Sequence, residues 1–216
     1  MTERQRILLL LDEGRLFLDG ISSNPDIAAQ LDLFGVKSED VTEGTLLLET
    51  ARTSVTQQDA AMAEQKLATE AMLKALETAY SAYTLLCEVA RAALAGDKTK
   101  LALLGIVGKT PRTAATLVPR GAALTEGLAA HPELAQLLTR HGQDAAALAA
   151  LQAKFAAFAA ADSQQQSAKG ATQRATAAQN ETLKDLKAWL GKVKRLARAA
   201  FRGDKQQLEK LGIVAR

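Results

Sequence analysis

The stretch ARAALAGDK at residues 90–98 recurs almost unchanged as ARAAFRGDK at residues 197–205, and each copy is followed by the tetrapeptide LGIV. At the same offset of 107 positions, residues 14–107 align with residues 121–214 without a gap. Of the 94 aligned pairs 25 are identical, and 12 of these identities lie in the last 18 pairs. A chance alignment of alanine-rich sequence would not concentrate matches at glycines and at an Asp-Lys pair. We therefore interpret the chain as a tandem duplication.

The composition predicts an all-α protein. The chain has 216 residues, of which 48% are hydrophobic and only 4% aromatic, with four prolines. Alanine and leucine are strong helix formers, whereas residues that favour strands are few. This length is sufficient to bury a sizeable core. We expect a pseudo-twofold, elongated helical bundle made of two equivalent helical repeats, with short accessory helices.

The two repeats differ in charge. The first repeat, residues 1–107, carries 10 Lys/Arg and 16 Asp/Glu, whereas residues 108–216 carry 17 and 8. Residues 108–120 contain two prolines and align with nothing helical, so we interpret them as a linker. The second, basic repeat then occupies residues 121–216. A linker of this length allows both repeats to pack side by side in one domain.

Proline and glycine residues mark helix ends in each repeat. Pro25 and Pro132 are each followed by an acidic residue, which is typical of a first helical turn. Gly105 and Gly212 follow the last short helix of each repeat, where glycine adopts a left-handed conformation at low cost. We expect positive φ at both glycines, and a β-branched replacement should cost about 1 kcal/mol or more.

The centre of each repeat leaves two arrangements open. Residues 38–95 contain no proline and one glycine, Gly44, which favours a continuous helix. Between Asp162 and Thr182 there is no large apolar side chain, and the demand for a buried core favours a turn. The chain either turns, giving a hairpin per repeat and a four-helix bundle, or continues as a helix of about 55 residues. Two such helices would be antiparallel, each about 80 Å long.

The residues that catalysis or metal binding would use are few. Cys87 lies in an apolar helical stretch and is expected to be a buried structural thiol. His131 precedes Pro132 at a helix start, and His141 precedes the helix-ending Gly142. Neither histidine has a second histidine or a cysteine at ligand spacing. We therefore predict no metal, no cofactor and no enzymatic activity.

Two further patterns do not predict a site. Glu39, Glu43 and Glu49 align with alanines of the second repeat, so they are interpreted as a solvated helix face. GIVGKT at residues 105–110 resembles the end of a phosphate-binding loop. The complete pattern requires a glycine where Leu103 stands, with a strand before it and a helix after it.

The most distinctive functional feature is the basic helix near the C-terminus. From residue 181 to the end there are ten Lys/Arg and four Asp/Glu. The candidate basic interaction face consists of Lys184, Lys187, Lys194, Arg195, Arg198 and Arg202. Packing of this helix against the chain's own acidic first half is the interpretation we favour. The alternatives are binding to a phosphate backbone, to an anionic membrane or to an acidic partner.

The sequence thus predicts a non-enzymatic helical scaffold or protein-interaction protein, whose partner is another protein or a second copy of the chain. The alternative is a nucleic-acid-binding protein that uses the basic C-terminal helix. The apolar run of residues 7–11 is too short for a signal peptide, and no uninterrupted apolar stretch reaches 18 residues. With a single cysteine as well, we expect a cytoplasmic protein without a transmembrane segment.

Overall fold

The computed structural model describes residues 1–108 and 113–214, and within these ranges it contains helices and no strand. The predicted all-α class is confirmed. In chain order the helices are α1 (Glu3–Ser22), α2 (Pro25–Leu33), α3 (Ser38–Ala93), α4 (Lys98–Leu103), α5 (Ala114–Ala130), α6 (Pro132–Thr139), α7 (Ala145–Ala200) and α8 (Lys205–Lys210).

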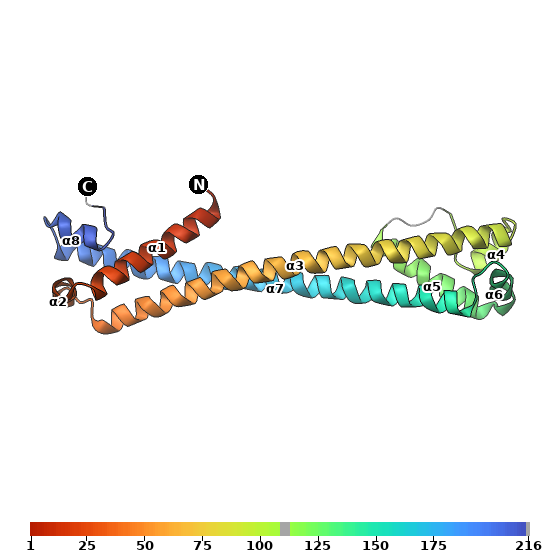
Figure 1. Ribbon diagram of the computed structural model, residues 1–216, viewed down its shortest axis with the longest axis horizontal. Coiled ribbons are helices and arrows are strands. Elements are labelled where there is room, and N and C mark those ends of the chain that lie inside the picture. The colour runs from red at the N-terminus through yellow and green to blue at the C-terminus, as the bar shows by residue number, and fades with distance from the viewer. Residues whose placement is uncertain (109–112, 215–216) are drawn as a thin grey trace. The chain divides into compact units, whose positions relative to one another are not determined.

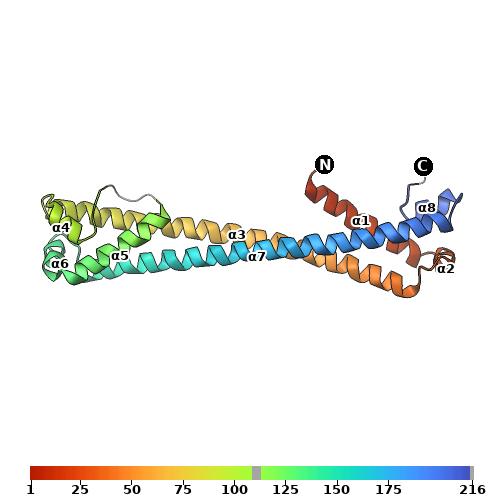
Figure 2. The same ribbon diagram turned by 180° about the vertical axis from the view of Figure 1, so that it is seen from behind.

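The chain forms two compact units that differ from the expected division at residues 107 and 121. Unit 1 combines Met1–Ala63 with Gly170–Arg216, and unit 2 is Glu64–Lys169. Each unit therefore contains parts of both repeats. The reason is that α3 and α7 are long, so that the two ends of each helix belong to different units (Figures 1 and 2).

The open question about the centre of each repeat is answered by α3 and α7, which are single helices of 56 residues each. Polar side chains in these helices satisfy themselves locally: the Thr69 hydroxyl donates to the Gln65 carbonyl, and the Thr176 hydroxyl to the Thr172 carbonyl. Such bonds within the helix let polar residues occupy it without a turn. The high helix propensity of these residues and the lack of proline also favour an uninterrupted helix.

In unit 1, α3 and α7 pack antiparallel. The hydroxyls of Ser54 and Thr182 are 2.7 Å apart, and the Thr172 hydroxyl donates to the Ala61 carbonyl at 2.9 Å, so numbering rises in one helix as it falls in the other. Helix α1 lies across this pair (Figure 1), and α2 and α8 close the same core. Its most buried side chains come from α1, α2, α3, α7 and the residue after α8, and include Phe17, Ile27, Leu31, Leu48, Leu186, Val193 and Leu211.

The tightest contact of unit 1 joins Trp189 of α7 to Gly44 of α3. A Cβ added at Gly44 would overlap the indole ring. Phe17 of α1 meets the other side of the cluster, with its ring perpendicular to that of Trp189 at a centroid distance of 6.1 Å. The missing side chain at position 44 is therefore what allows the largest aromatic group to be buried between three helices.

Unit 2 has its own core, to which α3, α4, α5, α6 and α7 contribute. Tyr83 of α3 and Phe155 of α7 meet edge to face at a centroid distance of 6.3 Å. The fully buried side chains around them include Leu86, Leu104, Leu117, Leu124, Leu138 and Phe158. As in unit 1, short helices cover a pair of long antiparallel helices.

The predicted helix ends are confirmed at several positions. Gly105 and Gly212 have φ values of 68° and 66°, in the left-handed region where glycine is favoured. Pro25 and Pro132 each stand at the first position of a helix. The sequence signals at helix ends were therefore reliable.

The predicted linker, residues 108–120, is in part wrong. Helix α5 begins at Ala114 and contains Pro119. The carbonyl of Thr113 accepts hydrogen bonds from the amides of Thr116 and Leu117, which starts the helix before the proline. A proline this close to a helix start removes one hydrogen bond without ending the helix. Residues 109–112, which include Lys109 and Thr110 of the Gly-Lys-Thr pattern, lie outside the described residues.

By length and composition alone, α7 contains an 18-residue window apolar enough to cross a membrane, with a mean hydropathy of 1.2. It is the one such helix among the described residues, and 11% of the window is buried. This differs from the expectation that no stretch would qualify. Alanine explains the difference, because the run in residues 144–161 raises the mean hydropathy although charged residues interrupt it.

The contact between Gly44 and Trp189 can be tested with two Gly→Ala substitutions that have the same effect on helix propensity. Gly44→Ala should destabilise the protein by about 1–3 kcal/mol, because the new methyl group overlaps the indole ring. Gly191→Ala should stabilise it by about 0.5–1 kcal/mol, because its Cβ would meet no atom within 4 Å. Urea denaturation measures both. Equal effects would show that Trp189 does not pack on Gly44.

Candidate functional site

The part of α7 in unit 1 has one strongly buried face. Leu186, Trp189, Leu190, Val193 and Ala197 are each at most 6% exposed. Their spacing of three and four residues is that of one side of an α-helix. Because Trp189 is held against Gly44, this side cannot rotate away from α3 without losing the contact.

The opposite side of the same helix carries cations. At about 100° per residue, Lys184, Lys187, Arg195 and Arg198 fall within an arc of about 80°. Arg202 follows in the turn directly after α7. All five are exposed to solvent. We call this set the basic face: Lys184, Lys187, Arg195, Arg198 and Arg202.

Lys194 departs from the prediction that it belongs to this exposed surface. It is 8% exposed, and its Nζ is ion-paired with the carboxylate of Glu13 in α1. The position lies at the edge of the buried side of α7, so the aliphatic stem packs inside while the ammonium meets a carboxylate. Lys194 therefore holds α1 on α7, and the other five predicted cations form the surface.

A second ion pair joins α7 to α3 on the other flank of the helix. Lys192 Nζ lies 3.3 Å from Asp40 Oδ1. The pKa of Asp40 is lowered, chiefly because its carboxylate accepts a hydrogen bond from the Lys37 backbone amide and also because of Lys192. Asp40 thus both caps the start of α3 and holds the end of α7.

The basic end of α7 packs against the acidic N-terminal segment, as favoured from the sequence, but few charges take part in this contact. Residues 1–63 carry 5 Lys/Arg and 11 Asp/Glu, and residues 170–216 carry 11 and 4, so unit 1 is almost neutral. Only Lys192 and Lys194 form ion pairs between these two segments, within the described part of the chain. No cation of the basic face forms an ion pair with any described residue.

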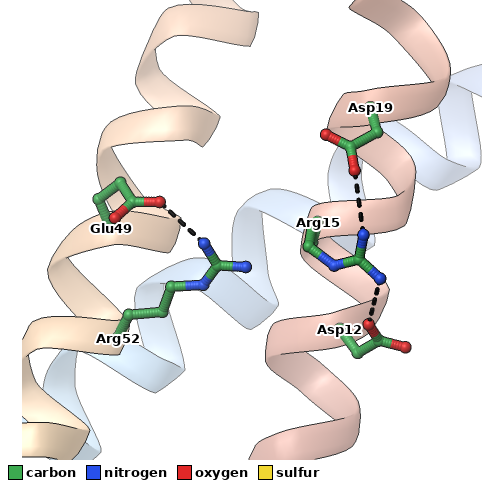
Figure 3. A network of polar contacts seen from close by, with 5 residues as sticks. All are labelled: Asp12, Arg15, Asp19, Glu49 and Arg52. Atoms are coloured by element: carbon green, nitrogen blue, oxygen red, sulfur yellow. Dashed lines mark hydrogen bonds and ion pairs between the residues drawn. The ribbon is translucent and has the colours of Figure 1, made fainter.

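Several carboxylates of unit 1 pair with cations other than those of the basic face. Arg15 bridges Asp12 and Asp19 along α1, with N–O distances of 2.8 and 3.3 Å (Figure 3). Glu49 pairs with Arg52 on α3 at 3.0 Å in the same view. These pairs lie within single helices and are exposed, so each contributes little to stability. They account for acidic side chains that the basic face of α7 does not use.

The cysteine and the two histidines considered from the sequence do not form a site. Cys87 is buried in unit 2, and burial raises the pKa of its thiol. His131 caps α6 by position, and its Nδ1 lies 3.3 Å from Glu133 Oε1. His141 is exposed. No group of three or more His, Cys, Asp or Glu side chains that could hold a metal gathers in residues 1–108 and 113–214.

The structure also brings residues to this site that the sequence did not identify. Glu13, the partner of Lys194, precedes the aligned repeats, and no pattern connects it to a lysine 181 residues away. Lys205 of α8 lines a groove together with Arg198 and Arg202. Lys205 belongs to the recurring Gly-Asp-Lys motif, but the sequence did not indicate that it lies beside the basic face.

No family model, no curated protein and no solved structure matches the chain. The function therefore has to be inferred from the residues and geometry of the site itself.

The ion pair between Lys194 and Glu13 predicts an asymmetric response to substitution. Glu13→Gln should destabilise the protein by about 1–3 kcal/mol, because it leaves the buried ammonium without its carboxylate. Lys194→Met should change stability by less than about 1 kcal/mol, because it removes the buried charge while Glu13, with a side chain 51% exposed, stays solvated. Urea denaturation of both variants is the measurement. A larger loss for Lys194→Met would contradict the structure.

Proposed function

We propose that this chain is a non-enzymatic helical scaffold that binds an acidic protein partner through the basic face of α7. One observation carries the proposal: four exposed cations share one side of α7, a fifth follows in the turn after it, and no described residue is ion-paired with them. A partner that brings carboxylates to this side would supply the missing counter-charges.

A protein partner fits this surface better than a nucleic acid does. Tight binding to duplex DNA depends on many phosphate contacts and on a broad positive potential. Here the basic face is one helix wide, and unit 1 as a whole is almost neutral. The exposed Glu181 and Asp185 stand on α7 beside the cations and would repel a phosphate backbone. Binding to nucleic acid remains the alternative function that the experiment has to exclude.

We also propose that the chain arose by tandem duplication of one helical module, so that its two repeats are equivalent. The helix bounds support this, since α3 and α7 begin and end 107 positions apart, as do α4 and α8. Duplication of a helical module also explains why each unit consists of a long-helix pair covered by short helices. Only one of the two copies then acquired the basic face.

The acidic-partner proposal can be tested with two variants of equal charge. The first, Lys184→Glu/Lys187→Glu/Arg195→Glu, reverses most of the basic face. The control, Lys66→Glu/Lys154→Glu/Lys169→Glu, changes the net charge equally at exposed positions of unit 2. We expect fluorescently labelled poly-L-glutamate to lose at least about tenfold in affinity for the first variant and little for the control.

The same titration with a short DNA duplex at about 50 and about 200 mM salt separates the two functions. Tighter binding to the duplex than to poly-L-glutamate, with a steep salt dependence, would establish the nucleic-acid alternative. Equal losses in both variants would show that the probe senses net charge and not the basic face. Either result would remove the proposal.

A further inference from the structure

The basic face of α7 ends at a groove of about 830 Å³ in unit 1. Arg198 of α7, Arg202 in the turn after α7 and Lys205 of α8 line it with positive charge, and the ion-paired Lys194 and Glu13 also belong to its lining. This volume is in the range of sites that hold a small ligand or a few residues of peptide. The groove is therefore a defined place at which a partner of the basic face can anchor.

Part of the groove wall is apolar. Phe201, Leu208 and Ile213 are buried and contribute to its lining, whereas Val214 is 82% exposed beside them. An exposed valine next to buried apolar groups offers a place for an apolar side chain from outside. The groove thus combines unpartnered cations with an apolar surface, so it suits a ligand with both properties.

The corresponding place in unit 2 is occupied by the chain itself. Arg120 stands 107 positions after Glu13, and its guanidinium donates to the carbonyls of Gly105 and Val107 at 3.1 and 2.7 Å. Arg91, the counterpart of Arg198, donates to the carbonyl of Gly108 at 3.3 Å. In unit 2 arginines therefore bind the backbone that follows the short helix.

Unit 1 differs at the same positions in a way that frees its cations. Glu13 stands where unit 2 has Arg120, and Lys194 stands where unit 2 has the buried Cys87. The Glu13 carboxylate is ion-paired with Lys194. The side chains of Arg198, Arg202 and Lys205 then pair with no carboxylate and no backbone carbonyl within residues 1–108 and 113–214. The charge of this groove is available to a ligand.

We propose that this groove binds a short acidic peptide segment of the protein partner, with one large apolar side chain next to its carboxylates. Arg198 and Arg202 bind the carboxylates, where the guanidinium geometry allows paired hydrogen bonds. The apolar side chain packs on Val214 and the wall formed by Leu208. This inference rests on the proposed function, because it names the segment by which the acidic partner is recognised.

Other anionic ligands fit the groove less well. Among the described residues that line it, Phe201 is the only aromatic one and is 8% exposed, so a nucleic-acid base has no accessible ring on which to stack. A lipid chain needs a long apolar cavity, whereas charged side chains line much of this groove. A peptide places carboxylates and an apolar group within a few residues of each other, as the lining requires.

The test is selection of a phage-displayed library of random short peptides on the intact protein. Enriched peptides are then synthesised, labelled and titrated by fluorescence anisotropy. We expect them to share acidic residues next to Leu, Ile or Phe. The variant Arg198→Glu/Arg202→Glu should weaken their binding by at least about tenfold. Val214→Asp, at a position too exposed to affect folding, should weaken it several-fold.

The matched control is Lys184→Glu/Lys187→Glu, which makes the same charge change on the same side of α7. Lys187 lies about 16 Å from Arg198 along the helix, beyond the screening length at physiological salt. Its effect should be less than about threefold. Thermal melts followed by circular dichroism confirm that each variant is folded.

The outcomes separate the groove from the basic face. Equal losses in the groove variant and the control would overturn the groove while leaving the acidic-partner proposal intact. Enriched peptides without acidic residues, or no enrichment, would also overturn the groove, and the poly-L-glutamate titration would still test the proposed function. Displacement of a selected peptide by micromolar laurate or by duplex DNA would show that the occupant is a lipid or a nucleic acid.

Discussion

The contact between Trp189 and Gly44 is the constraint on which the chemistry of unit 1 depends. A long helix without polar anchors could rotate about its axis until any side faced the core. The indole ring needs the space that a glycine leaves on α3, and Phe17 of α1 packs against its edge. These contacts fix which side of α7 is buried, and the cations on the opposite side are then exposed as a consequence of geometry.

The charges at the boundary of that buried side have a different task from those on the exposed side. Lys194 and Lys192 reach carboxylates of α1 and α3, one on each flank of α7. They bring the basic C-terminal segment and the acidic N-terminal segment into one nearly neutral unit. The excess charges of the two halves of the sequence are therefore of two kinds. A few form ion pairs between the segments of unit 1, and a larger number lie at its surface.

The helix ends could be predicted from the sequence because they depend on local chemistry. Proline at the first position of α2 and α6 and glycine with positive φ after α4 and α8 act within a few residues. The burial of Lys194 could not be predicted in this way, because it depends on Glu13 in a distant helix. The helical start of residues 108–120 was missed because proline was treated as a helix breaker, although Pro119 lies where it breaks only one hydrogen bond.

The two ends of the long helices show how one backbone can support different chemistry. The same Gly-Asp-Lys and Leu-Gly-Ile-Val residues shape the turn around α4 and around α8. Around α4, Arg120 binds carbonyls of the turn, and a thiol is buried at position 87. Around α8, a carboxylate at position 13 and a lysine at position 194 neutralise each other instead. With these two side chains exchanged, the arginines near α4 bind backbone carbonyls, whereas those near α8 are exposed to solvent.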